Sequence, residues 1–232
     1  MKQIPNTFTC LNLFSGCIAC VMAFKGQYEF ALLWVVIAAF LDFLDGFAAR
    51  LLKAYSAIGK ELDSLADVVS FGVAPGMVVF SYLNTLEKTP VAILPFFAFI
   101  IPVFSALRLA KFNIDERQTG SFLGLPTPAN ALFWGSFIPS FACFNIENEI
   151  LKAVIILGLA VITCLLMLSE IPMFSLKFKN FKWKGNEAQY ILIFLAVISL
   201  CLLNYTGICV TIVLYVLISM ILNIIRRNQS KS

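Results

Sequence analysis

The chain has 232 residues, of which 60% are hydrophobic and only 13% are charged, and its mean hydropathy is +0.91. A soluble domain cannot bury so many apolar side chains, so the composition excludes an ordinary globular protein and indicates a polytopic membrane protein. The net charge of +4 suits a basic face against anionic lipid headgroups and gives no support to a nucleic-acid partner.

Eight apolar stretches are long enough to cross a bilayer as helices. They cover residues 8–24, 29–50, 60–83, 91–111, 128–144, 150–169, 189–203 and 206–225. The sequence therefore predicts an all-α fold, a transmembrane bundle of about eight helices that forms a single membrane domain over residues 1–232. The last two stretches are short and meet at NYTG, which predicts a C-terminal hairpin (189–225) beside a six-helix core (1–169).

The opening segment has a lysine followed by an apolar run, as a signal peptide does. Pro5, Asn6 and Thr9 interrupt that transition, and no convincing small-residue cleavage site follows. We therefore expect this segment to be retained as the first helix.

The placement of lysine and arginine predicts the orientation of the bundle. With the N-terminus inside, all but three of the 17 basic residues fall on the inner side, and only Lys25, Lys88 and Lys152 fall outside. Because inner loops of membrane proteins carry the excess of positive charge, we expect both termini to face the cytoplasm of a multi-pass cell-membrane protein.

Four aspartates stand where a bilayer disfavours charge. Asp42 follows the unbroken apolar run 30–41 and so lies roughly 20 Å along a helix that needs about 30 Å to cross. An ionised side chain at such a depth costs about 2.5–3.5 kcal/mol. We therefore expect Asp42, Asp45, Asp63 and Asp67 to converge and to be neutralised.

The spacing of the aspartates allows this convergence. Asp42 and Asp45 are three residues apart on one helix, and Asp63 and Asp67 are four apart on the next, so each pair shares a helical face. Carboxylate oxygens alone favour a hard cation, Mg²⁺ or Mn²⁺, and four negative charges balance two such ions. Spacing alone leaves open an ion or proton pathway through a transporter, and a structural salt-bridge network.

The neighbouring residues favour catalysis. Gly46, Ala48 and Ala49 clear space beside the carboxylates for a bulky ligand, and Arg50 can clamp a phosphate. Together with divalent ions, these features indicate phosphoryl-type transfer. The chain has no histidine, which excludes histidine-based acid–base chemistry and phosphohistidine intermediates.

Residues 42–67 have the pattern D-x-x-D-G-x-x-A-R, followed after eight residues by G-x-x-x-D-x-x-x-D. This pattern matches every fixed position of the CDP-alcohol phosphotransferase signature. Outside it, IGKELDSLADVVSFGVAP (58–75), ALRLAKFNID (106–115) and FLGLPTPANA (122–131) resemble the membrane-embedded phosphatidylserine synthases of that family, and so does IPNTFTCLNLFSG (4–16). The phospholipase-D-like class of synthase depends on histidine nucleophiles, so this chain cannot belong to it.

The resemblance implies an enzyme that transfers the phosphatidyl group of CDP-diacylglycerol to the hydroxyl of L-serine and releases CMP at the cytoplasmic side. It implies that the four aspartates bind two divalent ions, that Asp67 is also the general base, and that the protein is a homodimer. We expect the six-helix core, 1–169, to be the catalytic part of the chain. The residues implied to contact CDP-diacylglycerol are Gly46, Ala49, Arg50, Ser56, Gly59, Pro5, Asn6, Thr7 and Phe8.

The acceptor site has two candidates. Arg108 and Lys111 stand toward the cytoplasmic end of the fourth apolar stretch, where they would meet the carboxylate of serine or extend to lipid phosphates. Other acceptors of the same chemistry, glycerol 3-phosphate or inositol phosphate, stay open, as does an ion-coupled transporter. The stretch 175–187 interleaves lysines with aromatic residues and predicts an interfacial anchor, and GLPTP (124–128) predicts a rigid start to a helix.

Overall fold

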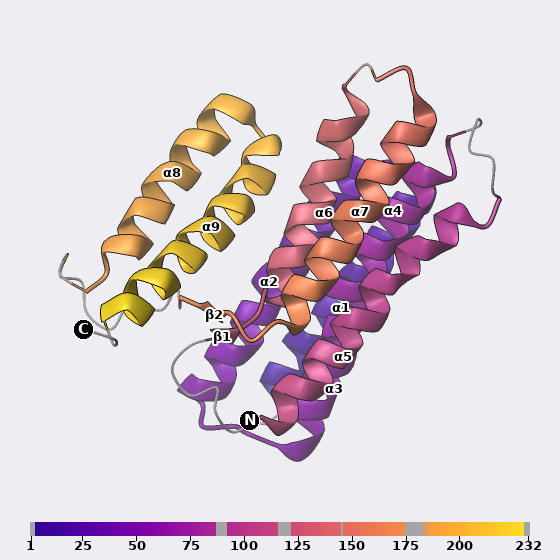
Figure 1. Cartoon of the computed structure of the whole chain (residues 1–232). Coiled ribbons are helices and arrows are strands. Elements are labelled where there is room, and N and C mark those ends of the chain that lie inside the picture. Colours follow the sequence, from indigo (N-terminus) through magenta and orange to yellow (C-terminus); the bar gives the residue numbers. More distant parts are fainter. Residues whose placement is uncertain are drawn as a thin grey trace.

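The computed structural model describes residues 3–86, 92–115, 122–144, 146–174, 183 and 185–229, and nearly all of them are helical (Figure 1). The long helices run side by side as a bundle, and the last two form a hairpin along one side of it. The α-helices are α1 (Gln3–Phe24), α2 (Tyr28–Leu51), α3 (Ala57–Asp67), α4 (Ala74–Leu83), α5 (Ile100–Ile114), α6 (Thr127–Ala142), α7 (Glu149–Leu168), α8 (Glu187–Leu203) and α9 (Thr206–Gln229).

Six helical stretches of the described chain are long and apolar enough to cross a membrane. They are Gln3–Phe24, Tyr28–Leu51, Ala57–Leu83, Leu94–Ile114, Glu149–Leu168 and Thr206–Ile225. The other two predicted stretches are also helical but shorter, since α8 has 17 residues and α6 has 16. The prediction of an all-α multi-pass membrane protein is confirmed, with six full-length spans and two shorter helices. The last two stretches were predicted to be short, which holds for α8 but not for α9, a helix of 24 residues.

The third span changes its helical geometry part-way. α3 passes through a π-helical segment, η1 (Val68–Val73), directly into α4, and the fourth span begins likewise as a 3₁₀ segment, η2 (Leu94–Phe99), before α5. π-Helical turns inside α-helices are rare and often lie at functional sites. Here the π-helical turn starts immediately after Asp67.

A tight turn reverses the chain between the two aspartate pairs. α2 ends at Leu51, and Lys53 takes a positive φ of 50°. Ser56 then caps α3, because its Oγ accepts a hydrogen bond of 3.1 Å from the backbone N–H of Gly59. The cap starts α3 at Ala57 and makes α2 and α3 consecutive, oppositely directed helices.

The interior of the bundle is packed by aromatic residues of α6. Trp134 is fully buried, and its Nε1 donates a hydrogen bond of 3.2 Å to Thr163 Oγ1 of α7. Phe133, Phe137 and Phe141 stack along the same helix. Many large apolar side chains face outward, which is the arrangement that a hydrocarbon surrounding requires.

A small pair of strands closes the end of α7. β1 (Phe122–Leu123) and β2 (Pro172–Met173) pair antiparallel, and the backbone N–H of Gly124 donates to Ile171 O at 2.9 Å. Gly124 has a φ of +70°, and a Cβ there would lie 2.8 Å from the carbonyl oxygen of Ser169, so only glycine fits. Pro126 then caps α6, as predicted for residues 124–128.

The C-terminal hairpin is attached through α9. Asn204, at a φ of 51°, makes the turn from α8 into α9, and Thr206 Oγ1 lies 2.8 Å from Ser140 Oγ of α6. Most of the predicted interfacial stretch 175–187 lies outside the described residues. Within it, Trp183 is exposed and stacks on Tyr190 of α8 at 5.3 Å between ring centroids.

Candidate functional site

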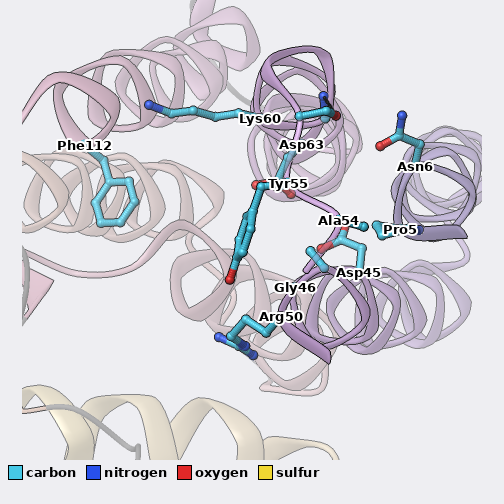
Figure 2. A pocket seen from close by; sticks show the side chains of 13 residues that line it. Pro5, Asn6, Asp45, Gly46, Arg50, Ala54, Tyr55, Lys60, Asp63 and Phe112 are labelled. Carbon is cyan, nitrogen blue, oxygen red and sulfur yellow. Dashed lines mark hydrogen bonds between the residues drawn. The ribbon is translucent and has the colours of Figure 1, made fainter. Parts of the chain in front are cut away.

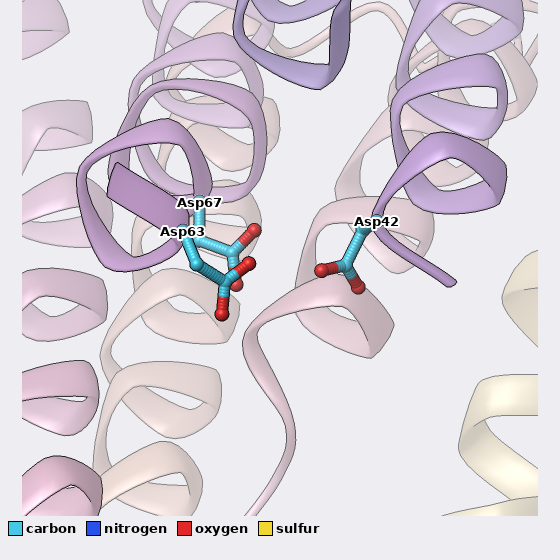
Figure 3. A group of neighbouring side chains, drawn as sticks. All are labelled: Asp42, Asp63 and Asp67. Atoms are coloured by element: carbon cyan, nitrogen blue, oxygen red, sulfur yellow. The ribbon is translucent and has the colours of Figure 1, made fainter. Parts of the chain in front are cut away.

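Three carboxylates from two helices meet inside the bundle. Asp63 and Asp67 of α3 face Asp42 of α2, and one oxygen of each lies within 4.8 Å of the others (Figure 3). Asp67 is buried, and the other two are partly buried. The two helix faces therefore converge at these three residues, as the spacing predicted.

The fourth aspartate, Asp45, lies one turn from Asp42 on α2 and is buried. Its Oδ2 accepts a hydrogen bond of 2.8 Å from Thr9 Oγ1. Asp67 likewise accepts one at Oδ1, of 3.2 Å, from Asn12 Nδ2. Both donors come from α1, and neither was a predicted site residue.

The negative charge of this group has little compensation from the protein. Asp63 Oδ1 is buried and has no hydrogen-bond partner among the described residues. Within the ranges that the structure describes, no lysine or arginine forms an ion pair with any of the four aspartates. Buried carboxylates with free oxygens and no ion-paired lysine or arginine among the described residues have the donor chemistry that a hard divalent cation requires, so the aspartate cluster can bind a metal.

A cavity of about 480 Å³ opens beside the carboxylates (Figure 2). Asp45 and Asp63 form part of its wall, so the cavity connects with the aspartate group. Its other lining residues are Pro5, Asn6, Gly46, Ala49, Arg50, Ala54, Tyr55, Ser56, Gly59, Lys60 and Phe112.

This cavity is lined by most of the residues that were predicted to contact CDP-diacylglycerol, but not by two of them. Thr7 and Phe8 are absent from the lining, and the Thr7 hydroxyl donates to Gln3 O of its own helix at 2.9 Å. Sequence reasoning missed Tyr55, which stands between Arg50 and Asp63 in Figure 2. It could have been found from its place in the short turn between the two aspartate helices.

Lys60 and Phe112 were also missed. Lys60 extends toward α5, where its Nζ donates to Asn113 O at 3.2 Å and ties α3 to α5. Its position next to Gly59 was a usable signal. Phe112 comes from α5, far along the chain, and no local pattern marks it.

The two glycines of the cavity differ in the space around them. A Cβ on Gly46 would meet no atom of the described chain within 4 Å, and Gly46 lines the cavity, so this backbone faces open space. A Cβ on Gly59 would lie 2.9 Å from Ser56 Oγ and 3.0 Å from Asn6 Oδ1. Gly59 therefore allows α1 and the start of α3 to approach each other.

Arg108 and Lys111 lie on α5, at a separate small hollow that also borders Phe112. Arg108 is only 7% exposed, yet its Nε and Nη2 have no hydrogen-bond partner in the described part of the chain. The Lys111 side chain is 43% exposed, and its Nζ lies 3.9 Å from Glu170 Oε1. The structure thus makes Arg108 a buried cation with free donors and Lys111 a surface cation beside a carboxylate.

The family model for CDP-alcohol phosphatidyltransferase matches residues 2–175. The chain belongs to this family. The match spans α1 to α7 and includes all four aspartates and the cavity, so the predicted resemblance is confirmed. Since enzymes of the CDP-alcohol phosphatidyltransferase family use divalent metals, membership agrees with the geometry of the aspartate cluster.

Relatives within the family carry related names. The chain is 35% identical over 202 residues to the CDP-diacylglycerol–serine O-phosphatidyltransferase of Helicobacter pylori strain J99, covering 84% of this chain and 80% of that protein. It is 37% identical over 188 residues to the protein of the same name in Bacillus subtilis strain 168, covering 81% and 96%. It is 31% identical over 170 residues to an archaetidylserine synthase of Methanothermobacter thermautotrophicus, covering 72% and 68%.

Proposed function

We propose that the protein is a CDP-diacylglycerol–serine O-phosphatidyltransferase, which transfers the phosphatidyl group of CDP-diacylglycerol to the hydroxyl of L-serine and releases CMP. One observation carries the proposal: the carboxylates Asp45 and Asp63 share the wall of one cavity with Arg50, in a chain whose relatives bear that name. A cation site and a phosphate-binding arginine at one cavity are what a pyrophosphate-linked lipid donor requires.

The donor would occupy the cavity with its pyrophosphate near Arg50 and Ser56. The guanidinium of Arg50 would bind phosphate oxygens, and the open backbone at Gly46 leaves room for them. Gly59 and Ala49 would border the nucleotide, and Pro5 and Asn6 of α1 would complete its pocket. Thr7 and Phe8 do not line the cavity, so the proposed donor site does not include their side chains.

We infer that two divalent ions, Mg²⁺ or Mn²⁺, would be held by Asp42, Asp45, Asp63 and Asp67. Bound there, the ions would supply positive charge that offsets the charge developing on the bridging phosphate and so makes CMP a better leaving group. The protein's own part is to fix the carboxylates from three sides, since α2 and α3 carry them and α1 donates hydrogen bonds to two of them.

Asp67 would act as the general base. Its Oδ1 accepts the hydrogen bond from Asn12, which leaves Oδ2 to take the proton of the serine hydroxyl. As that proton moves, the hydroxyl oxygen forms a bond to the phosphorus that bears diacylglycerol, and the bond from this phosphorus to the CMP oxygen breaks. The products are phosphatidylserine and CMP, with no covalent enzyme intermediate.

Arg108 would bind the carboxylate of serine. A buried guanidinium with two unpartnered nitrogens is costly unless a ligand satisfies it, and a carboxylate matches its paired donors. Lys111 has a lesser role in this proposal because it is exposed and lies beside Glu170. The alternative acceptors, glycerol 3-phosphate and inositol phosphate, carry a phosphate and need a more strongly cationic pocket.

We further infer a homodimer in the cell membrane, with both termini and the site toward the cytoplasm. Three basic residues, Arg50, Lys53 and Lys60, lie at the end of the bundle that carries the site. Lys25 and Lys152 lie at the opposite ends of their helices, which supports the proposed orientation.

The family match ends before α8, which supports a catalytic core of 1–169 with an added hairpin of 189–225.

The test is CMP release by the purified protein in mixed micelles of CDP-diacylglycerol with Mg²⁺ or Mn²⁺. Serine, glycerol 3-phosphate and inositol phosphate are supplied separately, and the lipid product is identified. We expect serine-dependent CMP and phosphatidylserine. Turnover with another acceptor alone would displace serine, and ion flux in proteoliposomes without any CMP release would favour the ion-coupled transporter.

A further inference from the structure

We propose that Thr9 and Asn12, one turn apart on α1, are positioning residues that hold Asp45 and Asp67 in the geometry needed for cation binding. The inference rests on the proposed function for its link to turnover, but its direct consequence is the affinity of the protein for a divalent cation. Neither residue belongs to the aspartate signature, and neither lines the cavity.

Thr9 of α1 contacts Asp45 of α2 across the interface between the two helices. Thr9 is buried, and its Oγ1 lies 2.8 Å from Asp45 Oδ2 and 3.1 Å from Pro5 O. A hydroxyl has a single proton to donate. The carboxylate of Asp45 is the nearer acceptor and carries charge, so the Thr9 hydroxyl donates its hydrogen bond there. This bond is of the stronger, charge-assisted kind.

Asn12 reaches Asp67 from the next turn of the same face. It is 0% exposed, and its Nδ2 lies 3.2 Å from Asp67 Oδ1. Its backbone oxygen accepts a further bond of 3.0 Å from Ser70 Oγ, in the π-helical turn that follows Asp67. Asn12 is thus connected by its side chain and its backbone to the helix that carries two of the aspartates.

The two hydrogen bonds determine which carboxylate oxygens stay free. They occupy Asp45 Oδ2 and Asp67 Oδ1, fix the rotation of both carboxylates, and leave the other oxygen of each to a cation or a proton. Because the acceptors are on α2 and α3 and both donors are on α1, the first helix also fixes the separation of the two aspartate faces. Groups that hydrogen-bond to metal ligands typically change metal affinity by about 10- to 100-fold.

The experiment measures Mn²⁺ affinity of the purified full-length protein by the electron paramagnetic resonance signal of free Mn²⁺. We expect Thr9→Val and Asn12→Leu each to weaken binding by about 10- to 100-fold. Thr9→Ser retains the hydroxyl and should keep the affinity of the wild type. The matched control is Ser15→Ala, because Ser15 Oγ on the same helix donates only to Leu11 O, at 2.8 Å, among described residues.

Melting temperatures without metal establish that each variant is folded. Should an apolar replacement not fold, Thr9→Cys and Asn12→Ser replace it, since both keep a small polar group that does not reproduce the bond, and the same loss is expected. Folded variants that bind Mn²⁺ as tightly as the wild type would overturn the inference, and so would a wild type that binds none.

The same preparations separate this inference from the proposed function. If the wild type releases no CMP with serine while the variants lose Mn²⁺ affinity, the proposed function fails and the positioning role stands. If the wild type turns over and the variants bind Mn²⁺ normally, only the positioning role fails. We expect the kcat of each variant to be closer to the wild-type kcat at saturating Mn²⁺ than at low Mn²⁺.

Discussion

Gly16 of α1 and Ser70 of η1 touch backbone to backbone, since a Cβ on Gly16 would lie 2.7 Å from the Cα of Ser70. This contact is one turn from Asn12, whose backbone oxygen also bonds to Ser70. The first helix and the third span therefore approach each other closely within one turn of Asp67. Small residues allow such approach between membrane helices, where packing provides much of the stability.

Gly16→Ala should destabilise the protein. The added methyl group overlaps backbone atoms that cannot rotate away, and overpacking of this kind costs about 1–3 kcal/mol. The measurement is the melting temperature in detergent, together with Mn²⁺ affinity, which should fall as α1 moves outward. Gly158→Ala on α7 is the control, because a Cβ there meets no atom within 4 Å. Equal melting temperatures for Gly16→Ala and the wild type would contradict the close contact.

Gly46→Leu should separate activity from stability. Its side chain would extend into the cavity where a Cβ has no neighbour within 4 Å, so the fold should keep its melting temperature. It would displace the donor's phosphates, and a displacement of about 1 Å can cost about 10²-fold in rate. We expect kcat/KM for CDP-diacylglycerol to fall by that order. Gly158→Leu, equally free of neighbours, should retain activity, and an active Gly46→Leu would exclude this cavity as the donor site.

Asp67→Asn should lower turnover by about 10²–10⁴-fold, the usual contribution of a general base. Because Asp67 is also a proposed metal ligand, Mn²⁺ affinity is measured in parallel. A folded variant that turns over normally at saturating Mn²⁺ would rule out Asp67 as the base. Glu61→Gln is the matched control, since Glu61 is an exposed carboxylate on the same helix and does not line the cavity.

Removal of divalent metal should abolish activity and lower the melting temperature together. No lysine or arginine of the described chain forms an ion pair with the four aspartates, so the cation-free site contains mutually repelling carboxylates. A cation at about 100 times its Kd stabilises a folded protein by about 2.7 kcal/mol. The protein is treated with EDTA and then restored with Mg²⁺ or Mn²⁺. An unchanged melting temperature and full turnover in EDTA would mean that the aspartates act without a metal.

Arg108→Gln should raise the KM for serine without raising that for CDP-diacylglycerol. A hydrogen bond to a charged group contributes about 1.5–3 kcal/mol, which corresponds to about 10- to 100-fold in affinity. Steady-state kinetics with each substrate varied separately measures both values. Lys152→Gln is the control, because Lys152 is in the first turn of α7 and the hollow of Arg108 borders the last turn of that helix. A rise in the KM of the donor alone would reassign Arg108 to the lipid nucleotide.

The fold and the aspartate site could be predicted because both depend on local patterns. Apolar runs set the helices to within a few residues, and helical spacing placed Asp42, Asp63 and Asp67 on faces that do meet. The boundaries moved where a cap intervened, as at Ser56, which starts α3 at Ala57 instead of near residue 60.

The partners of the aspartates could not be predicted in the same way. Thr9 and Asn12 are single polar residues in an apolar helix, and such residues also arise when a hydroxyl or amide bonds to its own backbone. Only the packing of α1 against α2 and α3 distinguishes the two cases. The free donors of Arg108 and the contribution of Phe112 likewise depend on contacts between distant segments.

The π-helical turn at η1 makes the length of one segment as important as its side chains. Successive residues of an α-helix are rotated by about 100°, and a π-helical turn holds one residue more than an α-helical turn, so η1 absorbs one such step. One further residue inserted into 68–73, with no second widened turn to absorb it, would swing Asp63 and Asp67 by about that angle relative to α4. The aspartate motif would still read correctly, yet its two halves would no longer face each other. Two chains with an identical motif can thus differ in activity through one insertion that leaves every signature residue intact.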